Sequence, residues 1–187
     1  MQITSKLVMA VVCLATTVVA LSGTQMPAWP APKAPTIPEA DGYVVIPGAA
    51  VTPSATVTYR AVLDATRNGK DRATLVPAVN AAGGILNDLA AAGVPTTNAK
   101  LAVVFHGAAL DGILNDAAFR AKFGTANPNL KVLSALKKQG VELFVCGQNL
   151  ASDHIDPKTL SPDVTVASDA FLVLITYQNK GYALMSF

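Results

Sequence analysis

Short apolar runs alternate with stretches of helical periodicity from about residue 58 to the last residue of the sequence. The apolar runs are rich in branched side chains and are bounded by glycine or polar residues, which is typical of buried strands. Strands separated by helices indicate βαβ units, so we expect an α/β fold with a mostly parallel, five-stranded sheet and helices on both faces. The five runs that predict strands are Tyr59–Thr66, Leu101–Phe105, Val141–Cys146, Val164–Ala167 and Tyr182–Phe187.

Helices are predicted for most of the segments between these runs. In the first helix the Gly83-Gly84 pair costs about 1 kcal/mol per glycine relative to alanine, which indicates close packing against a neighbour. Asn127-Pro128 is a start signal for a helix, and Ser168 followed by Asp169 is another. A short turn or helix is expected from Asp156-Pro157 to Leu160. The longer predicted helices span residues 76–92, 110–124, 128–139 and 169–179.

The first 22 residues have the three parts of a secretory signal peptide. Lys6 gives a basic start, an uncharged apolar run extends from Leu7 to Leu21, and small residues precede Gly23. The alternative is an uncleaved membrane anchor, but a run of about 15 residues is shorter than the roughly 20 that a spanning helix needs. We therefore expect cleavage near Gly23 and a periplasmic or secreted protein with no membrane contact.

Residues 23–57 separate the predicted signal peptide from the predicted domain. Residues 23–40 contain five prolines, which favour extended backbone and exclude a helix, so a flexible spacer is expected. The apolar run Tyr43–Ile46 predicts a small edge strand or an ordered arm laid against the domain. The expected organisation is a signal peptide at 1–22, a spacer and arm at 23–57, and one α/β domain at 58–187.

Composition and charge exclude several classes of function. Hydrophobic residues make up 51% of the chain and charged residues only 14%, which suits a well-buried core. The net charge is +2 and no Lys/Arg cluster occurs, so a nucleic-acid partner is not expected. The sequence lacks the glycine-rich and CxxC motifs of common cofactor and redox sites. His106 and His154 have no cluster of ligands around them, so we expect neither a metal nor a cofactor.

Cys146 is the residue at which the sequence becomes informative. Cys13 lies inside the predicted signal peptide, so cleavage leaves Cys146 as the one thiol of the mature chain. A lone thiol in an oxidising compartment is buried and inert, free and reactive, or paired between chains. Its position alone leaves two interpretations open, a reactive thiol and a small hydrophobic residue packed within a strand.

The other candidate residues fall at the carboxyl ends of the predicted strands, where ligands bind in open parallel sheets. We predict Cys146 as nucleophile and His106 as its acid–base or orienting partner. Backbone N–H groups after Cys146 would open a helix and favour the thiolate. The alternative for His106 is a strand-end histidine bonded to a loop, and for Asp64 a bond to the following turn. The predicted ligand pocket around the two residues consists of Asp64, Thr66, Gly107, Gly147 and Gln148.

Four phrases of the sequence together resemble the exported branch of the DsrE/DsrF-like family. The resemblance covers about Tyr59–Phe187, and its most telling part is the strand that ends in Cys146-Gly147-Gln148. It implies a three-layer α/β/α domain and a homo-oligomer, a trimer or hexamer. For members with a cysteine at this strand end it implies sulfur relay through a persulfide, and Cys146 matches that position. The phrases are YRAVLDATRNGKD, KLAVVFHGAALDGILND, NPNLKVLSALKKQGVELFVCGQNL and QNKGYALMSF.

Three functions follow as hypotheses. The first is a periplasmic sulfur carrier or sulfurtransferase-like protein, with sulfur donor and acceptor proteins or small thiols as partners of Cys146. The second is a non-catalytic binding module in which Cys146 only lines the pocket. The third is a structural oligomer tethered to a partner by residues 23–58. The sequence leaves open whether the protein is an enzyme.

Overall fold

Five parallel strands form the central sheet of the computed structural model, which describes residues 29–187. The predicted signal peptide therefore lies outside the described residues. The strand order is β4-β3-β2-β1-β5, and each pair of neighbours is parallel, so the predicted α/β fold and its five-stranded sheet are confirmed. The strands are β1 (Tyr59–Ala65), β2 (Ala99–Phe105), β3 (Glu142–Cys146), β4 (Thr165–Ala167) and β5 (Ala183–Ser186).

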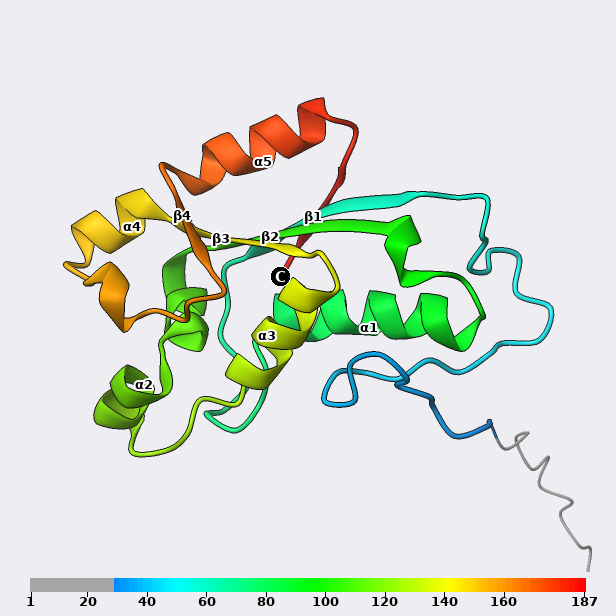
Figure 1. The fold of residues 1–187 in the computed structure, drawn as a ribbon, viewed down its shortest axis with the longest axis horizontal. Helices are drawn as coiled ribbons and strands as arrows, with labels where there is room; N and C mark the ends of the chain where they lie inside the picture. The colour runs from blue at the N-terminus through cyan, green and yellow to red at the C-terminus, as the bar shows by residue number, and fades with distance from the viewer. Residues whose placement is uncertain (1–28) are drawn as a thin grey trace, which may run out of the picture.

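Helices cover both faces of this sheet unequally (Figure 1). On one side lie α1 and α3, and on the other side a single helix, α5, crosses the strands. No helix among residues 29–187 is both long enough and apolar enough to cross a membrane. The helices are α1 (Pro77–Ala91), α2 (Asp116–Phe123), α3 (Leu130–Lys138), α4 (Gly147–Ser152) and α5 (Ala170–Asn179), with 3₁₀ segments at Thr96–Asn98, Gly107–Ile113 and Pro157–Thr159.

The alternation of side chains along the strands divides the core into two layers. Phe105 and Val145 face α1 and α3, in the larger cluster of buried residues. Val104 and Cys146 face α5, in a smaller cluster. Because both faces of the central strands are buried, these strands are almost wholly apolar in sequence, which is why the simple apolar runs predicted them correctly.

The prediction of one continuous helix over residues 110–124 was wrong, because the helix is interrupted. The chain forms a 3₁₀ segment to Ile113, extends through Leu114, and starts α2 only after Asn115. Leu114 makes an antiparallel bridge with Leu160, and the backbone N–H of Asn115 donates to Thr159. A tertiary contact with a segment about 45 residues later therefore overrides the local helical spacing.

Two of the predicted helix starts are shifted by one or two residues. The helix expected after Asn127-Pro128 begins at Leu130, because the side-chain carbonyl of Asn127 accepts the backbone N–H of Asn129 and forms a turn first. The N-cap of α5 is Asp169 itself, whose carboxylate accepts the backbone N–H of Phe171. Polar side chains set both helix starts, as the start signals predicted.

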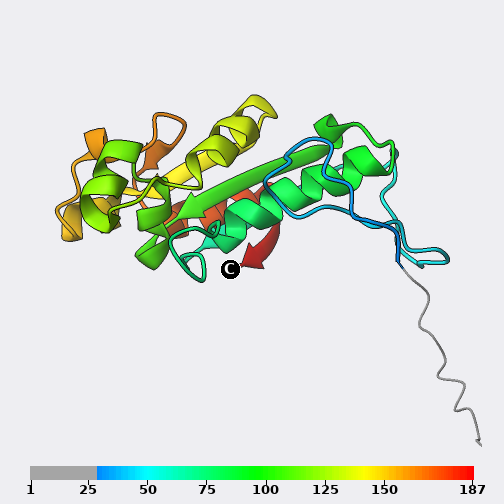
Figure 2. The same cartoon turned by 90° about the horizontal axis from the view of Figure 1, so that it is seen from below.

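The expected flexible spacer is wrong for residues 36–40, which pack onto α1. Ile37 is fully buried there, and Ala40 lies so close to Gly83 that a Cβ on that glycine would come within 2.4 Å of the Ala40 side chain. This contact is the close packing that the glycine pair indicated. Figure 2 shows this arm running alongside α1. Tyr43 forms only an isolated bridge with Lys33, so residues 43–46 belong to an ordered arm and not to an edge strand.

A buried amide, Asn87, fastens the arm to α1 with four hydrogen bonds. Its side-chain oxygen accepts the backbone N–H groups of Thr36 at 3.0 Å and Ile37 at 2.8 Å. Its side-chain nitrogen donates to the carbonyls of Ile37 and Asp41, both at 2.9 Å. The buried asparagine side chain is thus fully hydrogen-bonded. It provides hydrogen-bond partners for the backbone of the arm, which belongs to no sheet.

We expect Asn87→Ala to loosen the arm, because the variant leaves the buried backbone N–H of Ile37 without a partner and removes the other three hydrogen bonds of the Asn87 amide. An unpaired buried group costs about 1–3 kcal/mol, so the free energy of unfolding should fall by about that amount in urea denaturation. Limited proteolysis should also cut the arm faster. The matched control is Asn80→Ala, since Asn80 bonds only to exposed Asp41. A loss no larger than that of the control would contradict the proposed anchoring role.

Candidate functional site

Three polar or nucleophilic side chains lie in a row across the carboxyl ends of β3, β2 and β1. The register pairs Phe105 with Val145, so the next residues, His106 and Cys146, are neighbours on adjacent strands. Alternation turns both toward the face that α5 covers. Asp64 of β1 pairs in register with Val104 and points to this same face. The sheet thereby brings together residues that are 40 or more positions apart in sequence.

His106 is held by Asp64. The Nε2 atom of His106 lies 2.6 Å from Oδ1 of Asp64, and both side chains are partly buried. The ring of Phe171 meets the imidazole edge-on, with 6.2 Å between centroids. A carboxylate on one ring nitrogen fixes the orientation of the imidazole and leaves the other nitrogen for a reacting group. Asp64 therefore bonds a histidine and not the following turn, and His106 bonds a strand residue and not a loop.

The thiol of Cys146 lies at the N-terminal end of α5. Its Sγ atom accepts the backbone N–H of Ala170, the first residue of that helix, at 3.3 Å. The N-terminal N–H groups of a helix lack intrahelical acceptors, and the sulfur of Cys146 satisfies one of them. The sequence predicted a different donor. The helix α4 does begin directly after Cys146, but its backbone makes no capping hydrogen bond with the thiol.

Cys146 forms part of the wall of a cavity of about 430 Å³. The side chain is only 5% exposed, so a reactant must enter the cavity to reach the sulfur. The volume lies within the range of small-molecule pockets, roughly 300–1,000 Å³. Sequence reasoning missed five of the lining residues, because they come from α4 and from the start of α5. The lining residues are His106, Gly107, Cys146, Gln148, Asn149, Ser152, Asp169, Ala170 and Phe171.

Hydrogen bonds fix the loops at the mouth of this cavity. The backbone N–H of Gly107 donates to Oδ1 of Asn149 at 3.3 Å, which ties the end of β2 to α4. Gly107 has φ of 56°, a left-handed conformation that favours glycine. The side-chain nitrogen of Gln148 donates to the carbonyl of Ser168 at 3.2 Å, which ties α4 to the turn before α5. The cavity thus has walls that hydrogen bonds restrain around a largely buried thiol.

The predicted pocket residues separate into two groups. Gly107 and Gln148 line the cavity together with His106 and Cys146, and Asp64 acts on it through His106. Thr66 lies outside the lining, where its backbone N–H and Oγ1 both donate to the carbonyl of Phe187. Gly147 also lies outside it. A Cβ on Gly147 would come within 2.7 Å of the Ala167 carbonyl, so this glycine permits the close approach of β4.

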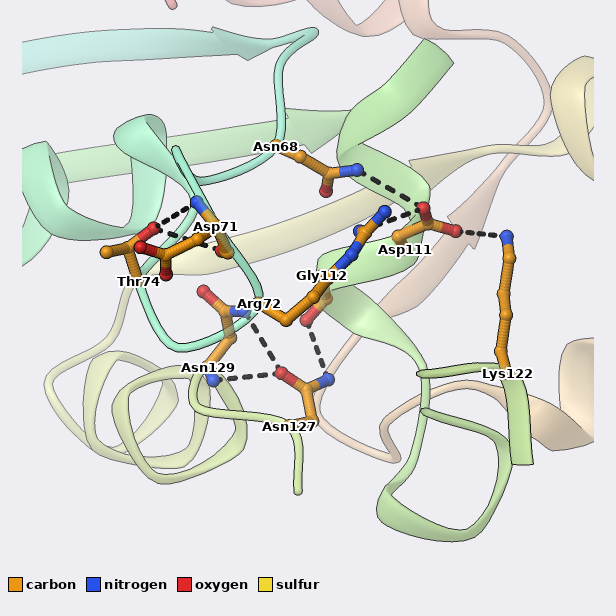
Figure 3. Close-up of polar contacts among 9 residues, drawn as sticks. All are labelled: Asn68, Asp71, Arg72, Thr74, Asp111, Gly112, Lys122, Asn127 and Asn129. Atoms are coloured by element: carbon orange, nitrogen blue, oxygen red, sulfur yellow. Dashed lines mark hydrogen bonds and ion pairs between the residues drawn. The ribbon is translucent and has the colours of Figure 1, made fainter. Parts of the chain in front are cut away.

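A polar cluster secures the 3₁₀ segment that follows His106 (Figure 3). Asp111 of that segment accepts a hydrogen bond from Asn68 at 3.2 Å and forms ion pairs with Arg72 and Lys122. Asn127 donates to the carbonyl of Gly112 at 3.0 Å. The loop after β1, the last turn of α2 and the loop after α2 are therefore joined to the 3₁₀ segment that follows β2. Among residues 29–187, no three potential metal ligands lie together.

Two solved structures align with this fold. One is the protein of unknown function MTH1491 from Methanobacterium thermoautotrophicum, which is 19% identical with a TM-score of 0.52. The other is the ychN protein from E. coli, which is 15% identical, also with a TM-score of 0.52. Each alignment covers 69% of this chain and 99% of the other. At such identities the likeness shows the fold alone.

Sequence comparisons place the domain more specifically. No curated protein sequence matches the chain significantly. The model of one protein family matches residues 54–187, which include every strand and helix of the sheet domain and all residues of the Cys146 cavity. The chain therefore belongs to the DsrE/DsrF-like family.

Proposed function

We propose that this protein is an exported sulfur carrier that relays sulfane sulfur through a persulfide on Cys146. Membership of the DsrE/DsrF-like family implies a role related to sulfur relay. The observation that carries the finer proposal is the position of the thiol. It lines a cavity, accepts the N–H of Ala170, and neighbours a histidine that a carboxylate orients. The signal-peptide pattern of residues 1–22 supports a periplasmic or secreted location for the protein.

The chemistry consists of two exchanges in which no external oxidant is consumed. The Cys146 thiolate attacks the outer sulfur of a donor persulfide, the donor S–S bond breaks, and the donor leaves as a thiolate. Cys146 then carries the sulfane sulfur as a persulfide. An acceptor thiolate attacks that outer sulfur, the new S–S bond breaks, and the Cys146 thiolate is regenerated. His106 takes the thiol proton in the first exchange and supplies it to the departing thiolate.

The shape of the cavity restricts the donor and the acceptor. Cys146 is nearly buried, so the sulfur atom of a donor or acceptor can reach it only at the end of a narrow, extended group. Small thiols and their persulfides meet this requirement, and so does a cysteine on a flexible protein segment. Phe171 and the uncharged amides of Gln148 and Asn149 line the cavity together with the carboxylate of Asp169. The alternative function, a binding module, places the same small thiol compounds there without covalent transfer.

The central prediction concerns persulfide formation. Treatment of the mature protein with polysulfide should add one or more sulfur atoms, detected by intact mass, and Cys146→Ser should abolish the addition. His106→Asn should slow loading by about tenfold or more, because it removes the acid–base group. The matched control is His154→Asn, since His154 lies outside the cavity lining and should leave the rate unchanged.

Two results would contradict the sulfur-carrier proposal. One is an adduct of equal mass in Cys146→Ser, which would place the reaction on another group. The other is a thiol that reacts only in denaturant, which would make Cys146 an inert core residue. In the second case, retained binding of small thiols by Cys146→Ser would favour the binding module.

The second part of the proposal is a homo-oligomer, a trimer or hexamer, that uses the outer face of α5. Three apolar side chains of this helix are more than half exposed, namely Phe171 at 65%, Leu172 at 56% and Ile175 at 53%. Neighbouring apolar groups that face water are typical of surfaces that associate. Phe171 also lines the Cys146 cavity, so a subunit seated on α5 would border the cavity entrance.

We expect Leu172→Glu combined with Ile175→Glu to shift the protein toward monomer, since buried charges without partners oppose association. Light scattering coupled to size-exclusion chromatography measures the effect at micromolar concentration. Val45→Glu serves as the control, because Val45 is 57% exposed on the arm and lies away from α5. A wild-type protein that runs as a monomer at that concentration would refute the oligomer.

A further inference from the structure

A second cavity lies between the N-terminal arm and the sheet domain, and we call it the arm pocket. It has a volume of about 290 Å³, close to the lower limit for small-molecule sites. Four of its lining residues come from positions 43–53, outside the residues that the family model matches. The pocket is therefore a feature of this chain and not of the shared domain alone. It is lined by Tyr43, Val51, Thr52, Pro53, Tyr59, Ile85, Asp88 and Leu89.

Asp88 is the only charged residue of this lining, and its carboxylate is poorly placed for stability. Partial burial, and secondarily the negative charge of Asp41, raise the pKa of the Asp88 carboxyl above its usual value. Asp88 lies in the last turn of α1, where the helix dipole disfavours negative charge and no basic residue compensates. Among residues 29–187 no hydrogen bond or ion pair reaches its side chain. A cation beside Asp88 would counteract the effects of its burial, of the Asp41 charge and of the helix dipole.

The other walls define what kind of cation fits. Two tyrosine rings, Tyr43 and Tyr59, belong to the lining, and aromatic rings attract cations. The hydroxyl of Tyr59 accepts the backbone N–H of Ser54 at 2.8 Å, which anchors this ring to the arm. Ile85 and Leu89 provide an apolar wall on α1. A ligand with a positive head and a hydrocarbon body matches both kinds of surface.

Other ligand classes fit less well. An anion would meet the charges of Asp88 and Asp41 with no basic side chain in the lining. A metal ion would find one carboxylate where hard cations take six or more oxygen ligands. A neutral apolar ligand would bury the Asp88 carboxylate further without a partner, which is costly.

We propose that the arm pocket binds a small organic cation, an ammonium group with an apolar body. Asp88 is the counter-ion, and Tyr43 and Tyr59 are the aromatic walls. Because the arm supplies half of the lining, the ligand also holds the arm against α1. The site is separate from Cys146 and does not depend on sulfur chemistry.

The test uses choline and its neutral isostere 3,3-dimethyl-1-butanol, which share shape and differ in charge. Each is titrated into the mature protein and followed by amide chemical shifts. We expect choline to shift the amides around Tyr43, Tyr59 and Asp88 and to bind at least about tenfold more tightly than the alcohol. Asp88→Asn should weaken choline binding about tenfold and leave the alcohol unchanged. Asp163→Asn, an acidic residue beside β4 at the far edge of the sheet, is the matched control.

Further variants keep the test decisive. Tyr43→Leu removes an aromatic wall while leaving Asp88 in place, and it should weaken choline more than the alcohol. Cys146→Ser should bind choline as the wild type does, so failure of the sulfur proposal and failure of this one are distinguishable. Ligand-free Asp88→Asn should melt at a higher temperature than wild type at neutral pH, because an unpartnered carboxylate is removed. Equal affinity for the two probes, or normal choline binding by Asp88→Asn, would overturn the proposal.

Discussion

The alternation of side chains between the two faces of a parallel strand is the constraint on which the site depends. Phe105 and Val145 must face α1 and α3 to fill the larger core, so His106 and Cys146, one residue further, must face α5. A shift of one residue in the register of β2 would turn His106 toward the larger apolar core and separate it from the thiol, and a shift of β3 would turn Cys146 away from the histidine. The burial of the apolar side chains in the core therefore also fixes the positions of His106 and Cys146.

Local patterns in the sequence were sufficient for the strands and for most helices, because buried parallel strands are nearly uniform apolar runs. The topology rule for parallel sheets then brought Cys146, His106 and Asp64 to one edge without knowledge of any contact. The rule could not supply the donor to the thiol. Ala170 reaches Cys146 only because the short strand β4 pairs beside β3 and returns the chain over it.

The errors of the sequence analysis have a common physical origin in long-range polar contacts. The break before Asn115 depends on Thr159, and the docking of the arm depends on Asn87, which lies on the buried face of α1. An asparagine among apolar helix positions was the available signal, since a buried amide needs partners from elsewhere. Residues 36–41 form a turn around Pro38, and the backbone groups of Thr36, Ile37 and Asp41 in it bind this amide.

The bond between Thr66 and Phe187 links the reactive edge of the sheet to an exposed edge strand, β5. β5 is mostly exposed and pairs only with β1, so hydrogen exchange should detect its opening before that of the central strands. The Phe187 backbone N–H donates to the carbonyl of Asp64, the residue that holds His106. Each fraying event at this edge therefore frees the backbone of Asp64 for a moment. We therefore expect the orientation of the imidazole to fluctuate with the opening of this edge strand.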